Sequence, residues 1–242
     1  MADTTRSLNT VRTFIESSRG LDPERRMKFY DTWAETYEKD SEMLDYRAPA
    51  LVVEFLAANF PESRENVRVL DVACGSGLVG KLMSELGFKH FVGVDGSKGM
   101  LDLAAQSGVY QDLRQALLGT EPLPAETGAF DLVAIIGALR PDFVPVSVLR
   151  ELHQAAKPGG LICMSRVDPK SEAGAEYRRC MERELRLMEE EGLWTPVATA
   201  EMDRYMVDVY NQHTQVEGEE KEQYLSGTIY LYRSSVNESL HS

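Results

Sequence analysis

A short apolar run that ends in a glycine turn constrains this 242-residue chain more than any other stretch. The run and the turn read Val-Leu-Asp-Val-Ala-Cys-Gly-Ser-Gly (69–77), and apolar residues at helical spacing follow from about Leu78 to Leu86. A buried strand, a Gly-x-Gly turn and a helix form the first βα unit of a nucleotide-binding α/β domain. Glycine lets the backbone turn sharply and lets a ligand approach the unpaired N–H groups at the start of the helix.

The acid inside this run bears on which nucleotide binds. Residues 75–80 spell G-x-G-x-x-G, the dinucleotide fingerprint, which is a weak signal alone. Asp71 ends the strand, and a carboxylate there would repel a pyrophosphate. S-adenosylmethionine (SAM) has no phosphate and brings an ammonium and a sulfonium instead. The alternative for Asp71 is a structural acid that holds loop N–H groups. Both interpretations favour SAM over a dinucleotide.

A second acid follows one βα unit later. Phe91 to Val94 reads as a strand that ends in Asp95, about 20 residues past the glycine turn, where an acid can accept the ribose hydroxyls. Ser97 has the position of a helix N-cap. Met100 in that helix either flanks the adenine or packs in the core.

Four motifs and an N-terminal signature occur in a familiar order. They are Asp-Val-Ala-Cys-Gly-Ser-Gly (71–77), Val-Asp-Gly-Ser-Lys-Gly-Met-Leu (94–101), Phe-Asp-Leu-Val (130–133), Lys-Pro-Gly-Gly (157–160) and, ahead of them, Tyr-Asp-Thr-Trp-Ala-Glu-Thr-Tyr (30–37). From about Tyr30 to Val207 the chain resembles the class I SAM-dependent methyltransferases. The resemblance implies a Rossmann-like α/β fold with a mostly parallel seven-stranded sheet, helices on both faces and an antiparallel C-terminal edge hairpin. Ala73 departs from the family, where many members have glycine, and we infer no loss of binding from it.

The resemblance also implies which residues surround the cofactor. The N-terminal helices form a lid in which Trp33 and Tyr37 face either the cofactor or the core. Arg47 either holds the methionyl carboxylate or makes a surface ion pair. Many relatives read adenine with an acid after the third strand, where this chain has Leu117, so backbone groups of 116–118 are expected instead. The expected cofactor set is Trp33, Tyr37, Arg47, Asp71, Ala73, Cys74, Gly75, Gly77, Asp95, Gly96, Ser97, Met100, Leu117, Leu118 and Gly137.

The sequence predicts one domain with a single internal boundary, a polar linker at 61–66. Residues 1–60 form the lid, 67–233 the core and 234–242 a flexible tail. Helices are expected at 22–39, 50–59, 145–156 and 171–191, with a mobile or loosely helical stretch at 8–15. Further strands are expected at 112–118, 130–137 and 161–167. Two β-like runs, 194–207 and 224–233, pair as a hairpin across an acidic stretch at 215–222.

The amino-acid composition narrows the classes of partner and the cellular location that we expect. The net charge of −13 argues against a nucleic-acid partner, because phosphate backbones favour basic patches. Three cysteines without a C-x-x-C pair suggest a reducing compartment, so we expect a cytoplasmic protein, with the nucleus open as a second location. No apolar run reaches the ~20 residues of a membrane helix, the first ten residues do not resemble a secretory signal, and no metal-ligand pattern occurs.

These observations lead to one hypothesis and three rivals. The hypothesis is a SAM-dependent methyltransferase with a small-molecule or protein acceptor and S-adenosylhomocysteine as product. A general base is needed only if the acceptor arrives protonated. The candidates are Tyr37, Asp142, Asp168 and Tyr205, and the sequence selects none. The rivals are a non-catalytic SAM-binding sensor or partner subunit, a nicotinamide-dependent oxidoreductase, and an RNA methyltransferase.

Overall fold

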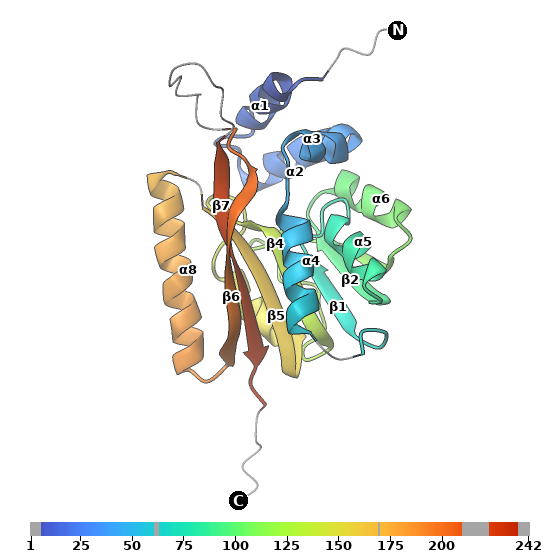
Figure 1. Ribbon diagram of the computed structural model, residues 1–242, viewed down its shortest axis with the longest axis vertical. Coiled ribbons are helices and arrows are strands. Elements are labelled where there is room, and N and C mark those ends of the chain that lie inside the picture. Colours follow the sequence, from blue (N-terminus) through green and yellow to red (C-terminus); the bar gives the residue numbers. More distant parts are fainter. Residues whose placement is uncertain (1–5, 61–62, 169, 210–222, 237–242) are drawn as a thin grey trace, which may run out of the picture.

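The computed structural model describes residues 6–60, 63–168, 170–209 and 223–236. Its centre is a seven-stranded sheet in the order β3-β2-β1-β4-β5-β7-β6 (Figure 1). The strands are β1 (Arg68–Val72), β2 (His90–Asp95), β3 (Tyr110–Gln115), β4 (Phe130–Leu139), β5 (Ala156–Asp168), β6 (Trp194–Val207) and β7 (Tyr224–Ser234). The first five strands are mutually parallel. β7 runs antiparallel between β5 and β6, which confirms the predicted fold and its C-terminal hairpin.

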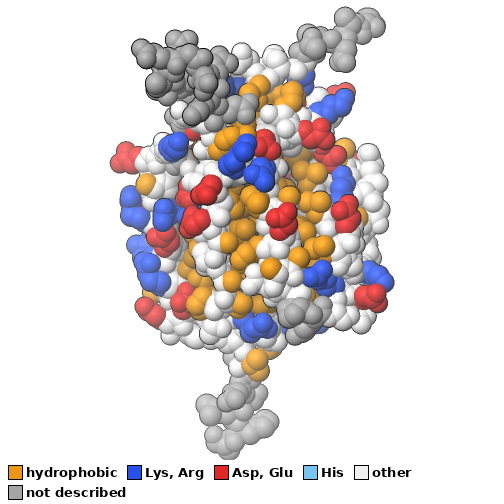
Figure 2. Space-filling view, viewed as in Figure 1, with side chains coloured by type: hydrophobic (Ala, Val, Ile, Leu, Met, Phe, Trp, Pro, Cys, Tyr) orange, Lys and Arg blue, Asp and Glu red, His pale blue; other side chains and the backbone are white. Residues whose placement is uncertain are grey.

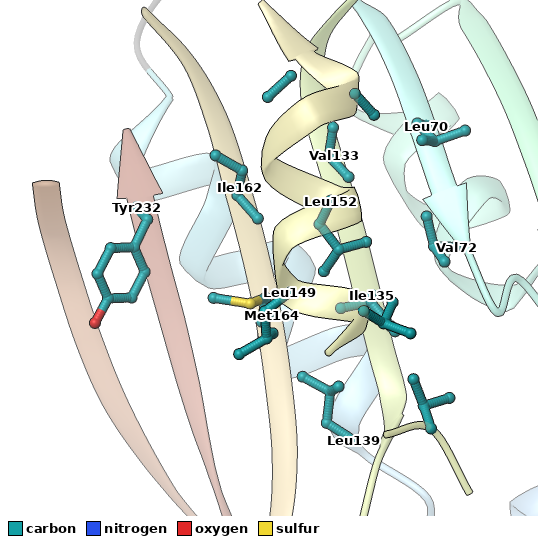
Figure 3. Packing of buried hydrophobic residues seen from close by; sticks show 14 of the residues in the cluster. Leu70, Val72, Val133, Ile135, Leu139, Leu149, Leu152, Ile162, Met164 and Tyr232 are labelled. Carbon is teal, nitrogen blue, oxygen red and sulfur yellow. The ribbon is translucent and has the colours of Figure 1, made fainter. Parts of the chain in front are cut away.

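Helices cover both faces of the sheet because the central strands are apolar on both sides. Successive side chains of a strand point to opposite faces. Leu70 and Val72 therefore pack with α7 (Val148–Ala155) and α8 (Glu172–Glu190), and Figure 3 shows α7 lying over β4 and β5. The intervening residue Val69 packs with α4 (Ala48–Asn59) and α5 (Leu78–Glu85). α6 (Lys98–Gln106) follows β2.

The N-terminal segment forms a separate small cluster at one end of the molecule (Figure 1). It comprises α1 (Leu8–Glu16), α2 (Pro23–Trp33), a 3₁₀ turn (Ala34–Thr36) and α3 (Tyr37–Met43), which together we call the lid. The lid predicted over 1–60 also included α4, but α4 packs against the sheet instead. The expected single helix over 22–39 is wrong after Trp33. Buried Asp40 accepts hydrogen bonds from the Trp33 indole N–H (2.7 Å) and the Thr36 hydroxyl (3.2 Å). These side-chain contacts accompany a break that helical spacing does not reveal.

Other expected boundaries shift by a few residues. β3 begins and ends earlier than the expected 112–118, and α7 begins at Val148 rather than at 145. β5 starts at Ala156, before the Lys-Pro-Gly-Gly turn. β7 reaches the buried Ser234, so this residue belongs to the sheet, and the acidic stretch 215–222 lies outside the described residues. Within the described residues, no helix is both long and apolar enough to span a membrane.

Candidate functional site

The glycine loop between β1 and α5 has three residues with left-handed backbone conformations. Ala73, Gly75 and Gly77 have φ values of +56°, +55° and +87°. The glycines adopt this region freely, whereas Ala73 carries a Cβ that disfavours it. The loop leads into the N-terminus of α5, where unpaired N–H groups face outward.

Asp95 ties this loop to the next one. Its carboxylate accepts hydrogen bonds from the Gly75 N–H (2.9 Å) and the Ser97 N–H (2.8 Å). Burial raises the pKa of Asp95 above its ordinary value, and these two bonds act against that rise. The Ser97 hydroxyl caps α6 by accepting from the Met100 N–H at 3.2 Å, as the sequence predicts. The β1 and β2 loops therefore form one connected cradle.

Asp71 is bonded to a phenol rather than to loop N–H groups. The Tyr110 hydroxyl donates to its carboxylate at 2.7 Å, and Asp71 is almost fully buried. Burial raises the pKa of Asp71 to about 7. The Tyr110 ring lies directly against Gly77, Gly80 and Gly93, where any Cβ would crowd it. Two glycines of the G-x-G-x-x-G pattern are thus explained here by a close-packed tyrosine, without a pyrophosphate.

The lid is fastened to the cradle through α2. The Asp31 carboxylate accepts from the Ser97 hydroxyl (2.7 Å) and the Gly99 N–H (2.9 Å) at the start of α6. One turn earlier, Met27 lies against Gly96, so closely that a Cβ there would clash. An anionic side chain at a helix N-terminus is stabilised by the helix dipole.

A cavity of about 520 Å³ lies between the lid and the carboxyl ends of β4 and β5. Of the expected cofactor set, Trp33, Tyr37 and Gly137 line it. The pKa of Tyr37 is raised, first by burial, and the nearby charge of Asp95 adds to the rise. α2 lines the cavity through Tyr30 and Trp33 and is bonded to the cradle through Asp31, so the cavity and the cradle share this helix.

Phenols meet at the floor of this cavity. The hydroxyls of Tyr46 and Tyr205 lie against Gly137, which has a φ of +82° and no room for a Cβ. Burial raises the pKa of Tyr46 well above its ordinary value and that of Tyr205 to about 12. Because burial keeps the pKa of both phenols above neutral pH, neither is suited to act as a general base there.

The four candidate bases do not all lie at the cavity. Tyr37, Asp142 and Tyr205 line the cavity, whereas Asp168 is not on its wall and pairs with buried Arg166. Asp142 adopts a φ of +60° in the loop after β4, so backbone strain accompanies the cavity rim. No group of three potential metal ligands comes together in the part of the chain that the structure describes.

Ser76 is a candidate that the sequence analysis missed. Its hydroxyl is buried, and among the described residues it has no hydrogen-bond partner. Buried hydroxyls are almost always bonded, so one without a partner in a glycine loop fits a site for a polar ligand. Its position between two glycines was the available signal.

Two residues of the expected cofactor set make contacts within the protein that the sequence did not predict. The Arg47 side chain is exposed at the start of α4 and is not part of the cavity wall, while its backbone N–H donates to the Tyr205 carbonyl (2.9 Å). The Leu117 N–H, expected to face adenine, donates to the Glu121 carboxylate at 2.7 Å. An acid, Glu121, therefore lies beside the segment that follows β3, four residues later in the chain than Leu117.

Comparisons with known proteins agree with this geometry. Residues 69–160 match the model of a methyltransferase domain. The chain is 40% identical over 199 residues to human methyltransferase-like protein 27, covering 82% of this chain and 80% of that protein. It is 31% identical over 186 residues to a ubiquinone biosynthesis O-methyltransferase of Cereibacter sphaeroides, covering 67% and 73% of the two chains.

Solved structures share the fold at lower identity. A putative methyltransferase in complex with the Trm112 activator of Haloferax volcanii has a TM-score of 0.57 at 19% identity, covering 83% of this chain and 96% of its own. A putative methyltransferase of Bacillus halodurans has a TM-score of 0.54 at 17% identity, covering 77% and 99%. The sheet order and the glycine loop thus define a Rossmann-like methyltransferase fold. The chain belongs to the SAM-dependent methyltransferase family, with SAM as cofactor and S-adenosylhomocysteine as product.

Proposed function

We propose that this methyltransferase acts on a small-molecule acceptor held in the cavity between the lid and the ends of β4 and β5. The observation that carries the proposal is the position of this cavity beside the cradle made by the glycine loop and Asp95. Its volume of about 520 Å³ lies in the ordinary range for small-molecule sites. A cavity covered by helices suits a small molecule better than a protein side chain on a large surface.

In this proposal, different residues of the cradle contact different parts of the cofactor. Asp95 accepts the ribose hydroxyls with the lone pairs that its two N–H donors leave over. Ser76 offers its buried hydroxyl to a polar group of SAM, and Asp71 faces the ammonium group of SAM. The adenine lies between Met100 and the 116–118 segment, with Glu121 beside it. The remaining expected residues stay as predicted contacts: Trp33, Tyr37, Arg47, Ala73, Cys74, Gly75, Gly77, Gly96, Ser97, Leu117, Leu118 and Gly137.

When bound, SAM supplies a methyl group on a sulfonium, whose C–S bond breaks with the electron pair going to sulfur. The chain's own residues mainly align the acceptor for this in-line displacement. The Tyr46 and Tyr205 hydroxyls orient an acceptor atom at Gly137, and the lid excludes water. The acceptor atom contributes its lone pair, and any proton on it passes to the Asp142 carboxylate on the cavity wall.

The chemistry of the relatives supports an oxygen acceptor. Several relatives at 31–33% identity are named ubiquinone biosynthesis O-methyltransferases. We extend this acceptor atom, and not their substrate, to the present chain. A cytoplasmic location remains a prediction from the cysteine content.

Calorimetric titration with SAM, S-adenosylhomocysteine and NADH tests the cofactor part. We expect both sulfur nucleotides to bind, NADH not to bind, and Asp95→Ala to remove binding. Asp102→Ala, which alters only an exposed ion pair with Lys98 on α6, is the matched control. NADH binding in place of the sulfur nucleotides would refute the assignment.

Transfer of a labelled methyl group tests catalysis. The protein is incubated with methyl-labelled SAM and a whole cell extract, which is then separated into a small-molecule and a protein fraction. Label in a small molecule supports the proposal. Tight S-adenosylhomocysteine binding with no label in any fraction supports the rival, a non-catalytic sensor.

A further inference from the structure

The described part of the cavity wall has a net positive charge, whereas the whole chain has a net negative charge. Among the residues that the structure describes, four basic side chains line the cavity, Arg19, Arg26, Arg140 and Lys170, against two acidic ones, Asp142 and Asp208. The whole chain has a net charge of −13. Basic residues therefore gather where a bound molecule would lie, whereas acidic residues predominate in the chain as a whole.

Two of these guanidinium groups are held on opposite elements around one ring. The Arg140 guanidinium lies 4.2 Å from the centroid of Phe143, and the Arg26 guanidinium lies 5.3 Å from it. Arg26 is buried and donates to the Leu21 carbonyl at 2.7 Å. Arg140 donates to the Tyr30 hydroxyl at 3.3 Å. Stacking on an aromatic face fixes the plane of a guanidinium.

The positive charge reaches the floor of the cavity. Arg140 acts to lower the pKa of both Tyr46 and Tyr205, the two phenols at Gly137, although burial outweighs it. An acidic group of a ligand placed there would experience the same stabilisation of its anion. The basic end and the phenol end of the cavity are thus close enough to act on one small molecule.

Aromatic side chains share the rest of the described wall with aliphatic ones such as Leu44 and Leu225. Tyr30, Trp33 and Tyr37 pack edge-on or tilted, with centroid distances of 4.9 to 6.4 Å. All three line the cavity together with Tyr46 and Tyr205. Aromatic walls favour planar, apolar ligands, and a few charged groups then determine specificity.

We propose that the acceptor is an aromatic small molecule with a carboxylate, whose anionic group faces Arg140 and Arg26 while its ring packs among the tyrosines. This inference rests on the proposed function and specifies its substrate class. An arginine fork recognises a carboxylate with charge-assisted hydrogen bonds, and a neutral amide of the same shape loses the charge. The cavity should therefore discriminate between an acid and its amide.

The test measures binding to the full chain saturated with S-adenosylhomocysteine. The probes are 4-hydroxybenzoate with 4-hydroxybenzamide, and 6-hydroxy-2-naphthoate with its amide, each titrated by calorimetry. We expect each acid to bind at least about tenfold more tightly than its amide, the size of one charge-assisted contact. Arg140→Gln should remove most of this preference, and Arg140→Lys should keep part of it.

A surface arginine provides the control. Arg178→Gln on α8 breaks only an exposed ion pair with Glu182 and should leave the acid-to-amide ratio unchanged. Thermal unfolding of each variant checks that it is folded. Equal affinity for acid and amide, no binding of either acid, or a preference that survives Arg140→Gln overturns the inference. S-adenosylhomocysteine affinity is measured first, because its absence contradicts the methyltransferase assignment and not the acceptor class.

Discussion

Ala73 has a left-handed backbone at a position that glycine would occupy more easily. Its φ of +56° disfavours an alanine by roughly 1–2 kcal/mol. Ala73→Gly should therefore raise the free energy of unfolding, by about 0.5–1 kcal/mol once the greater flexibility of the unfolded chain is counted. Urea denaturation measures it. As a control, Ala175→Gly in the exposed part of α8 should lower stability by about 1 kcal/mol. If Ala73→Gly lowered stability as Ala175→Gly does, the left-handed backbone at Ala73 would not be strained.

The Asp71 carboxyl makes stability depend on pH. Its pKa of about 7 in the folded protein lies above the ordinary value, because burial disfavours the charged form. The stability that goes with the protonated acid is complete below pH ~4 and is lost as the pH rises through about 7. The Tyr110 hydroxyl limits that loss by donating to the carboxylate.

Tyr110→Phe should consequently destabilise the protein more at about pH 8.5 than at about pH 6, since a charged acceptor loses about 1.5–3 kcal/mol and a neutral one less. Urea unfolding at the two pH values measures the difference. Tyr177→Phe removes a hydroxyl that donates to the Val144 carbonyl (2.7 Å), so its cost should not change with pH. An equal cost for Tyr110→Phe at both pH values would show that Asp71 does not titrate in this range.

At the scale of elements, the lid depends on a small number of polar contacts with the core. Asp31 of α2 connects it to the first turn of α6 through Ser97 and Gly99. Asp31→Ala should loosen α2 and speed the release of S-adenosylhomocysteine several-fold, with little change in global stability. Hydrogen exchange of residues 23–43 and stopped-flow release measure the two effects. Asp102→Ala on α6 is the control. Unchanged hydrogen exchange in the Asp31→Ala variant would show that the Asp31 contacts do not hold α2 on the cofactor loops.

At the scale of the whole molecule, the charge distribution argues against an RNA acceptor. Figure 2 shows basic and acidic side chains interspersed over the visible face, without a continuous basic area. With a net charge of −13, we expect no binding of a 20-nucleotide single-stranded RNA tighter than about 10⁻⁴ M at physiological salt. Fluorescence anisotropy measures it. Micromolar binding that weakens steeply with salt would revive an RNA acceptor.

Local patterns in the sequence predicted most of the fold. The strand, glycine turn and helix around Gly75, the Ser97 N-cap and the C-terminal hairpin all follow from short-range periodicity and turn chemistry. The same logic placed Asp95 at the end of β2. These features depend on residues close in sequence, whose geometry is largely independent of the remaining chain.

Only the tertiary structure decided which distant side chains meet. The Asp71–Tyr110 pair spans 39 residues, and the Asp31–Ser97 contact spans 66, so no local pattern announces either. The break after Trp33 accompanies contacts to Asp40 that override helical spacing. The exposed position of Arg47 and the unpartnered hydroxyl of Ser76, counted among the described residues, likewise became visible only in three dimensions. By itself the sequence determined the fold class, because that depends on local backbone geometry, and it indicated the cofactor through Asp71 and through short motifs that resemble those of the class I methyltransferases. The acceptor cavity depended on tertiary packing, since it forms only where the lid meets the ends of β4 and β5.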